Sequence, residues 1–212
     1  MSGWAAIVLG VVAGYFFGGI PFGLLVGRLS GVGDVRTMGS GKTGFTNSLR
    51  NMGWKWASIV VVGDVAKGVA AVLIGSLVLH EPWAGALAGV AAVIGHIFPV
   101  FAGFRGGRGV ATAFGAFLGV SWPAALVVVV FSIAILAIFR YASLMSVVGV
   151  FVGFLAVVAL VLLNRLDEPY LVFAVLTMLA VEISHVGNIR RLLAGTEPKL
   201  GQGGGRPVSG AH

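Results

Sequence analysis

Three blocks of polar residues interrupt an otherwise apolar sequence, and the first has the composition of an anion-binding loop. It runs from Arg36 to Arg50 and alternates Gly with Ser, Thr and Lys. In such a loop the backbone N–H groups can converge on an anion, and hydroxyl and cationic side chains complete its shell. Phosphate is the expected ligand. The alternative is a basic loop that only fixes membrane topology. The candidate ligands are Ser40, Gly41, Lys42, Thr46, Asn47 and Arg50.

The segment GSGKT in this block is not the nucleotide-binding P-loop that it resembles at first sight. The pattern G-x-x-x-x-G-K-[ST] would need Gly at position 36, where this chain has Arg36. No strand pattern precedes the segment either. The sequence therefore does not predict a nucleoside triphosphatase.

The second block, residues 95–112, contains two arginines among glycines, in the order Arg105-Gly106-Gly107-Arg108-Gly109. An apolar run follows, so Gly107 and Arg108 would lie beside the free N–H groups at the start of a helix. One guanidinium group can donate two parallel hydrogen bonds to two oxygens of the same phosphate. The block predicts a second anion site, with a flexible turn whose arginines set orientation as the alternative.

The third block places Glu182, His185 and Asn188 at intervals of three residues, ahead of Arg190 and Arg191. On a continuous helix the first three would share one face. Glu-x-x-His can be a metal-ligand pair, but no second carboxylate and histidine with matching spacing occurs. The sequence predicts neither a metal site nor an organic cofactor.

Asp64 and Lys67 are charged residues within an apolar run. At a spacing of i and i+3 on a helix they would face each other and partly neutralise one another. Charges inside a membrane helix are costly, so they are candidates for a functional role, with mutual pairing as the alternative. Both can hold, and we expect the two residues, like Glu182, to support the site.

The elements that position these blocks must be membrane helices. The chain has 212 residues, of which 58% are hydrophobic and only 10% charged. Soluble domains are about 25% charged, so this is an integral membrane protein. The absence of Cys excludes a disulfide scaffold, thiolate metal sites and a cysteine nucleophile. The net charge of +7 lies in short loops between apolar runs, so a lipid bilayer rather than nucleic acid is the expected partner.

An all-α fold with seven transmembrane helices is expected, since a spanning helix needs roughly 20 apolar residues. The spans are approximately 4–27, 57–79, 83–101, 109–121, 122–139, 142–163 and 170–187. The fourth is short. If it is counted as a crossing, Arg165 is the only Lys or Arg in the loops on one side of the membrane, and all the other loop cations lie on the opposite side. Basic loops face the cytoplasm, so we predict the N-terminus outside and the C-terminus in the cytoplasm.

One membrane domain is expected over residues 1–200, with its active site at the cytoplasmic face. Residues 201–212, GQGGGRPVSGAH, are Gly-rich and predict a flexible cytoplasmic tail.

Two functions fit these features: an enzyme that handles phosphate at the cytoplasmic interface, or a membrane carrier for phosphorylated small solutes. A carrier predicts polar residues at mid-bilayer on several helices. Here nearly all polar residues gather toward one face, which favours the enzyme. An anion site beside large apolar helices suits a substrate with a phosphate head and an acyl tail.

The ordered motifs resemble a known family, the bacterial acyl-phosphate:glycerol-3-phosphate acyltransferases (PlsY). The resemblance covers nearly the whole chain. It rests on GGIPFG from Gly18, GSGKTGFTN with Arg50, Asp64-x-x-Lys67-Gly68, GHIFPVFAGFRGGRGVAT, Arg140-Tyr141-Ala142-Ser143-Leu144 and HVGNIRRLLAGTEPK. The family commonly has Asn where this chain has Lys42, and Lys where it has Arg108.

The resemblance implies an enzyme of the bacterial cytoplasmic (inner) membrane that performs the first acylation of phospholipid synthesis. It would move a fatty acyl group from acyl phosphate to the position-1 hydroxyl of glycerol 3-phosphate, giving lysophosphatidate and inorganic phosphate. We expect it to act as a monomer. The H-x-x-x-x-D signature of thioester-using acyltransferases is absent, since His80, His96 and His185 are followed five places on by Gly85, Phe101 and Arg190. Acyl phosphate is therefore the expected donor.

The resemblance also assigns roles to the candidate residues. Ser40, Gly41, Thr46, Asn47 and Arg50 would cradle phosphate. Arg108, His185 and Asn188 would hold glycerol 3-phosphate or orient its hydroxyl, with Ser143 nearby. Either His185 or an oxygen of a substrate phosphate would take the hydroxyl proton. His185 is the candidate from the protein, because an imidazole titrates near neutral pH.

Overall fold

The structure, a computed structural model, describes residues 3–202 and contains no β-strand within that range. Its longer helices are α1 Gly3–Gly18, α2 Phe22–Leu29, α3 Phe45–Leu73, α4 Pro82–Ile97, α5 Val110–Val120, α6 Trp122–Phe139, α7 Ala142–Leu162, α8 Pro169–Ser184 and α9 Val186–Leu193. Short helical turns are η1 Val35–Thr37, η2 Ile74–Val78 and η3 Val100–Ala102. Residues 203–212 of the expected tail lie outside the described residues.

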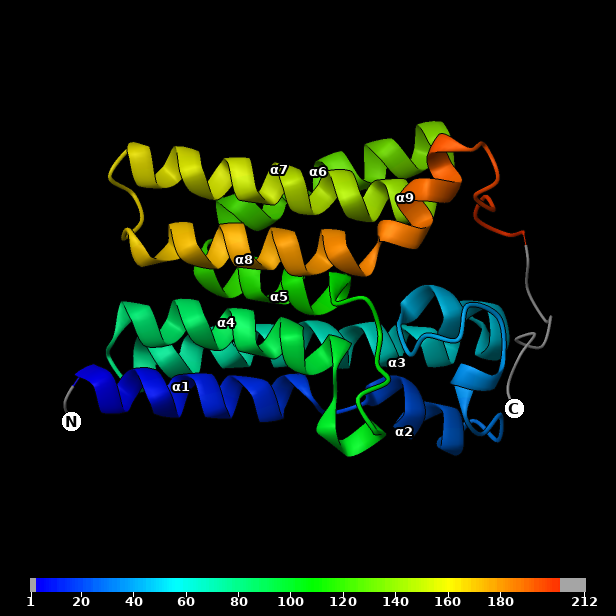
Figure 1. The fold of residues 1–212 in the computed structure, drawn as a ribbon, viewed down its shortest axis with the longest axis horizontal. Helices are drawn as coiled ribbons and strands as arrows, with labels where there is room; N and C mark the ends of the chain where they lie inside the picture. Colours follow the sequence, from blue (N-terminus) through cyan, green and yellow to red (C-terminus); the bar gives the residue numbers. More distant parts are fainter. Residues whose placement is uncertain (1–2, 203–212) are drawn as a thin grey trace.

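The longer helices run back and forth along one axis, as expected of a multi-pass membrane protein (Figure 1). Five segments are long and apolar enough to cross a bilayer: Gly3–Leu29, Phe45–Val78, Pro82–Ala102, Trp122–Phe139 and Ala142–Leu162. α8 and α9, bent by 62° where they meet, would together form a sixth. α5 has 11 residues, about 17 Å at 1.5 Å per residue, and the hydrocarbon core is about 30 Å thick. The all-α membrane fold is confirmed, and the count of seven crossings stays a prediction.

One predicted span differs from the structure in a way that affects the site. The span predicted over 57–79 belongs to a helix that begins at Phe45, so that the second half of the first polar block is helical. Hydropathy does not identify this first part of the helix because its residues are polar. Gly53, with φ 77° and ψ 177°, breaks the helical path between this polar start and the apolar remainder of α3. Only glycine adopts such angles without steric cost.

α1 and α4 pack with their backbones close together. Gly10, Gly14 and Gly18 recur every four residues on α1, and each faces an alanine of α4 in the series Ala84, Ala88 and Ala92. A Cβ on Gly14 would lie 2.8 Å from the Cα of Ala88. Small residues at such a spacing let membrane helices approach closely and gain van der Waals contact. The contact fixes the end of α4, from which the second polar block continues.

The core lies between α4, α5, α7 and α8. The rings of Phe117 and Phe173 meet edge to face, with centroids 5.2 Å apart, and both side chains are fully buried. Val93 and Val157 belong to the same cluster. This core joins short α5 to α8, which carry the residues that flank the second and third polar blocks.

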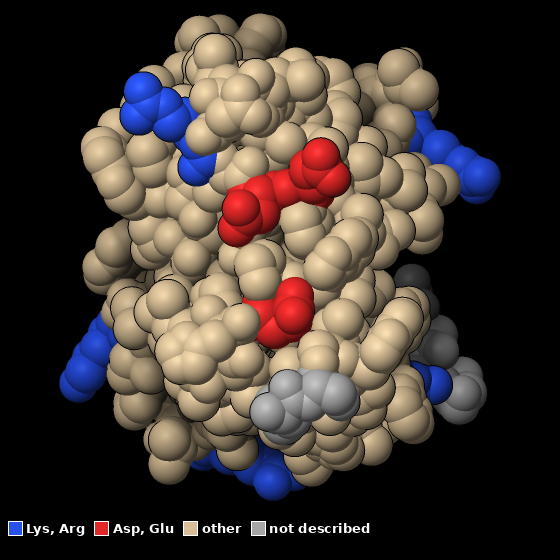
Figure 2. All heavy atoms as spheres, turned by 90° about the vertical axis from the view of Figure 1, so that its left-hand side faces the viewer, with Lys and Arg blue, Asp and Glu red and all other residues tan. Residues whose placement is uncertain are grey.

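The two ends of the bundle differ in charge. The turn before α4 and the turn before α8 contribute Glu81, Asp167 and Glu168 to one end. Figure 2 shows acidic side chains in the middle of that end, with basic ones mostly at its margin. The three polar blocks lie at the opposite end of the bundle (Figure 1).

Candidate active site

A cavity of about 380 Å³ brings the three polar blocks together. Its polar part is lined by four cationic side chains, Lys42, Arg50, Arg108 and Arg191. Its apolar part extends between α3, α5, α6 and α7 and is lined by Val61, Val65, Phe114, Phe117, Val128, Ile133 and Val150. The cavity therefore combines a cationic compartment with an apolar one.

Most of the candidate residues line this cavity. Those that do are Ser40, Lys42, Thr46, Asn47, Arg50, Asp64, Arg108, Ser143, His185 and Asn188. Gly41 and Gly107 instead line a second cavity, which Lys42 also lines, and Lys67 and Glu182 line neither. Glu182 belongs to α8, whereas Asn188 lies beyond the 62° bend, so the three-residue spacing does not continue along one straight helix.

Asn47 organises the first polar block from within. Its buried side chain donates from Nδ2 to the carbonyl oxygens of Val35 (2.8 Å), Met38 (3.2 Å) and Lys42 (2.9 Å). Its Oδ1 accepts from the Ser40 N–H at 2.9 Å. The amide thus shapes the loop that presents Lys42.

The free N–H donors near this loop belong to α3. The N–H groups of Ser40 and Gly41 are used within the loop, on Asn47 Oδ1 and the Met38 carbonyl. Gly44 caps α3 without a side chain, and within residues 3–202 the N–H groups of the first turn, from Phe45, have no acceptor. A helix start of this kind attracts anions through its free N–H groups and its dipole.

Replacing Asn47 with alanine is expected to destabilise the protein by roughly 2–4 kcal/mol, because one N–H and three carbonyls lose a buried partner. Thermal unfolding in detergent would measure this. Asn51→Ala is the matched control, since Asn51 lies one turn further and donates only to Asn47. Equal losses in the two variants would contradict the organising role of Asn47.

The second polar block is held against the end of α4 and the end of α8. The N–H groups of Gly106 and Gly107 donate to the carbonyls of Ile97 and His96 at 3.2 and 3.1 Å. A Cβ on Gly107 would collide with the His96 ring, so only glycine fits there. Ser184 Oγ donates to the Arg108 carbonyl at 2.9 Å. These contacts fix the backbone that carries Arg108.

The cations at the cavity are close enough to disfavour one another. Burial lowers the pKa of the Lys42 ammonium below its usual value, and the charge of Arg108 lowers that pKa further. Burial likewise lowers the pKa of Arg108, with Glu197 opposing the shift. The buried Nε atoms of Arg50 and Arg108 have no acceptor in the described part of the chain. An anion in the cavity would relieve both the repulsion and the missing hydrogen bonds.

His185 lies at the bend between α8 and α9, where its side chain is buried. Its Nδ1 is 2.8 Å from the Val181 carbonyl oxygen, which fixes that nitrogen as the N–H donor. In the neutral ring Nε2 then keeps its lone pair. His185 is therefore arranged to accept a proton or a hydrogen bond at Nε2.

Glu197 ties α9 to the segment that follows it. Its two carboxylate oxygens accept from Asn188 Nδ2 and Arg191 Nε, both at 2.7 Å. Burial opposes ionisation of Glu197, but the nearby Ser143 hydroxyl together with these bonds from Asn188 and Arg191 more than offsets it, and the pKa of Glu197 lies below the usual value. The carboxylate thus fixes two side chains that line the cavity.

Asp64 and Lys67 pair as expected, at 2.8 Å, and both are fully buried. Lys67 Nζ also donates to the Ile20 carbonyl at 2.9 Å, and His96 Nδ1 lies 3.3 Å from the Asp64 carboxylate. The group joins α3 to α4 and to the break between α1 and α2. Lys67 serves this junction rather than the cavity.

The sequence did not single out His96, Arg191 and Glu197, although all three line the cavity. His96 contacts Asp64 between α4 and α3, which are far apart in the chain, whereas Glu197 contacts Asn188 and Arg191, nine and six residues before it. The one available signal for Glu197 was a carboxylate in an otherwise basic segment that follows the third block. In residues 3–202 no group of three or more His, Asp or Glu side chains is placed to hold a metal ion.

Comparison with known proteins agrees with this architecture. The family model described as glycerol-3-phosphate acyltransferase matches residues 8–195. The glycerol-3-phosphate acyltransferase of Parasynechococcus marenigrum (strain WH8102) is 44% identical over 190 residues, which cover 89% of this chain and 87% of that protein. The enzyme of that name from Mesorhizobium japonicum is 43% identical over 199 residues, covering 93% and 98%.

Two crystal structures of PlsY (YgiH), described as an integral membrane glycerol 3-phosphate acyltransferase, have the same fold. The glycerol 3-phosphate form superposes with a TM-score of 0.83 at 34% identity, and the lysophosphatidic acid form with 0.82 at 32%. Each comparison covers 91% of this chain and 94% of the other. The helices, the cavity and these matches together show that this chain belongs to the glycerol-3-phosphate acyltransferase family.

Proposed function

We propose that the protein transfers a fatty acyl group from acyl phosphate to the position-1 hydroxyl of glycerol 3-phosphate, releasing lysophosphatidate and inorganic phosphate. The observation that carries the proposal is the single cavity that is cationic at one part and apolar at the other. Both products and both substrates carry phosphate, and the acyl donor and lysophosphatidate also carry an apolar chain. The two PlsY structures, named for their glycerol 3-phosphate and lysophosphatidic acid forms, support this reading.

Acyl phosphate is the donor that suits this cavity. It is a mixed anhydride, so the glycerol hydroxyl can attack the acyl carbon directly, without a covalent enzyme intermediate. The protein then needs to position the two substrates and to neutralise the phosphate that leaves. Lys42, Arg50 and Arg108 supply cations, and the first turn of α3 supplies N–H donors.

The hydroxyl of glycerol 3-phosphate would lie near His185 and Ser143. The Ser143 Oγ is buried near Glu197, whose pKa it lowers, and makes no hydrogen bond of good geometry in the part of the chain that the structure describes. His185 keeps a lone pair at Nε2, as argued above, and can accept the hydroxyl proton during attack. Asn188 and Arg191, fixed by Glu197, would hold the phosphate of the acceptor.

We further propose that the cavity faces the cytoplasm, in the inner membrane of a bacterium, and that one chain makes a complete site. The end with the polar blocks is rich in Lys and Arg, and the other end carries the acidic turns. Cytoplasmic loops carry such an excess of basic residues. All the side chains assigned above come from a single chain.

Phosphate release by purified protein in lipid, with palmitoyl phosphate and glycerol 3-phosphate, is the first test. A parallel reaction with palmitoyl-CoA in place of palmitoyl phosphate identifies the donor. We expect release that requires glycerol 3-phosphate, formation of lysophosphatidate, and no turnover of the thioester. Turnover with palmitoyl-CoA alone would overturn the donor assignment. Folded protein that is inactive with both donors would favour a carrier for phosphorylated solutes, which flux into vesicles would then measure.

A further inference from the structure

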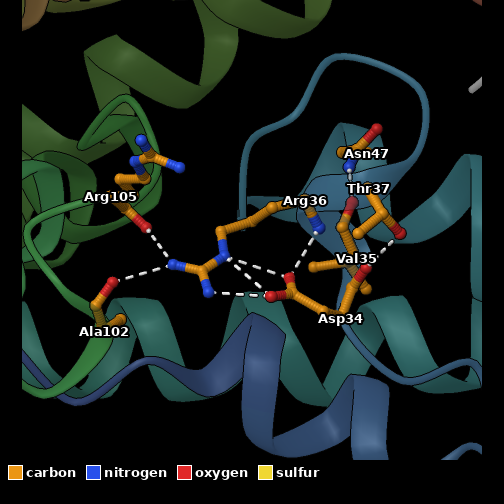
Figure 3. Close-up of polar contacts among 7 residues, drawn as sticks. All are labelled: Asp34, Val35, Arg36, Thr37, Asn47, Ala102 and Arg105. Carbon is orange, nitrogen blue, oxygen red and sulfur yellow. Dashed lines mark hydrogen bonds and ion pairs between the residues drawn. The ribbon is translucent and has the colours of Figure 1, made fainter. Parts of the chain in front are cut away.

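Arg36 joins the first and second polar blocks, although it lines the second cavity and not the active-site cavity. Its Nη1 donates to the carbonyl oxygens of Ala102 at 2.8 Å and Arg105 at 3.2 Å. Its Nε and Nη2 donate to the Asp34 carboxylate at 3.0 and 2.7 Å. Figure 3 shows the guanidinium between these two groups of acceptors, with Asp34 on one side and the two carbonyls on the other.

Asp34 prepares this arrangement. Its Oδ1 also accepts from the backbone N–H of Arg36 at 2.9 Å, so the carboxylate fixes both the backbone and the side chain of the arginine. The hydrogen bonds from Arg36 hold the pKa of Asp34 below its usual value, against the opposing effect of partial burial. Only a planar guanidinium can meet a carboxylate with two of its nitrogens and two carbonyls with the third.

Both ends of this bridge continue into the active site. On the first block, the neighbouring Val35 carbonyl accepts from Asn47, which in turn shapes the loop that carries Lys42 (Figure 3). On the second block, Arg105 precedes Arg108 by three residues. Arg36 therefore connects the backbones that present the two cations.

The connection opposes a repulsion. The charge of Arg108 contributes to the lowered pKa of Lys42, after burial, which is the larger cause. Repulsion between these like charges favours separation of the two loops when no anion lies between them. A bridge outside the cavity opposes that separation before substrate binds and so reduces the free energy that binding must supply.

We propose that Arg36 is a positioning residue that holds the Lys42 loop and the Arg108 loop together before substrate binds. The proposal rests on the proposed function of the cavity. It assigns Arg36 no contact with substrate. Its loss should therefore weaken substrate binding more than it slows the chemical step at saturation.

Steady-state kinetics of Arg36→Ala and Arg36→Lys test the proposal. We expect the alanine variant to raise KM for palmitoyl phosphate, whose phosphate Lys42 and Arg108 would bind, about tenfold or more, while kcat stays within about threefold. The lysine variant should recover only part of this, because an ammonium cannot make both sets of contacts. Asp34→Asn should raise KM in the same direction. Adding it to Arg36→Ala should cause little further change, as expected for residues that act as a pair.

Arg105→Ala is the matched control, because it removes the same charge from the same surface but keeps the carbonyl to which Arg36 donates. If Arg105→Ala raises KM as much as Arg36→Ala, general attraction of the anionic substrate explains the effect and the proposal is wrong. An unchanged KM in Arg36→Ala, or a fall in kcat alone, also overturns it. If Arg36→Ala does not fold, the same criteria apply to Asp34→Asn.

A second measurement reports the loops directly and does not depend on turnover. The chain contains no cysteine, so Thr37→Cys and Phe101→Cys, both at exposed positions, can carry one spin label in each block. We expect Arg36→Ala to broaden the distance distribution between the labels, and palmitoyl phosphate to narrow it again. An unbroadened distribution would refute the bridge even in an active enzyme. Broadening in a protein that is inactive with every donor would leave the bridge intact and refute the proposed function.

Discussion

Arg108→Ala is expected to lower the rate of phosphate release by about 10²- to 10³-fold, the range found when a preorganised charge-stabilising donor is removed. Arg108 is half-buried, and its buried Nε has no acceptor in the described residues, so it is free to bind the leaving phosphate. Arg108→Lys should stay within about tenfold of the original rate, because it keeps the charge and loses only the fork. Release of phosphate from palmitoyl phosphate at saturating glycerol 3-phosphate measures both.

Arg165→Ala provides the control for loss of charge. Arg165 is exposed in the turn before α8, at the end of the bundle away from the cavity. We expect its rate to match that of the original protein. Full activity in Arg108→Ala, with protein shown to be folded, would remove Arg108 from the site.

His185→Ala is expected to lower kcat by about 10²- to 10⁴-fold if the imidazole is the general base. The neutral ring is the active form, so the rate of the original protein should fall as the pH is lowered and the ring gains a proton. The variant should lose this dependence on pH. The pH profile of kcat in both proteins therefore tests the role of the ring more directly than the loss of rate does.

His80→Asn is the matched control, since His80 is exposed, lies outside the cavity, and has a φ of 51° that asparagine tolerates. A kcat for His185→Ala close to that of the original protein, with the pH dependence retained, would exclude the imidazole as base. An oxygen of a substrate phosphate would then be the base. A raised KM in that variant would leave His185 as a residue that only orients the acceptor.

The prediction of a membrane fold depended on local properties, and it is confirmed. The segment Trp122–Phe139 matches its predicted span residue for residue because its ends are marked by Pro123 and by Arg140. The α8–α9 segment contains a bend that its hydropathy does not predict. Its apolar run predicts one span over 170–187, yet the chain bends by 62° at His185. Hydropathy averages over such a bend, beside which Ser184 donates to the Arg108 carbonyl and Asn188 donates to Glu197.

The candidate site was predicted better in its composition than in its roles. Ser40, Arg50 and Arg108 were chosen as anion ligands from residue type and spacing, and they do line one cavity. Asn47 was chosen for the same reason, but its amide is used on the Val35, Met38 and Lys42 carbonyls. Residue type cannot distinguish these uses, because a side chain that binds phosphate can equally bind a backbone.

By itself the sequence determined that this protein is helical, lies in a membrane and concentrates its cations and hydroxyls in three short blocks. These properties follow from residue type and period, which are local. Only the tertiary structure decided that the three blocks share one cavity, that Glu197 and Arg36 hold its walls, and that Lys67 belongs to a separate junction. Apart from the contacts of Glu197, which lie within nine residues of it, each of these depends on which helix packs against which, and the free energy of that packing is a sum over contacts distant in the chain.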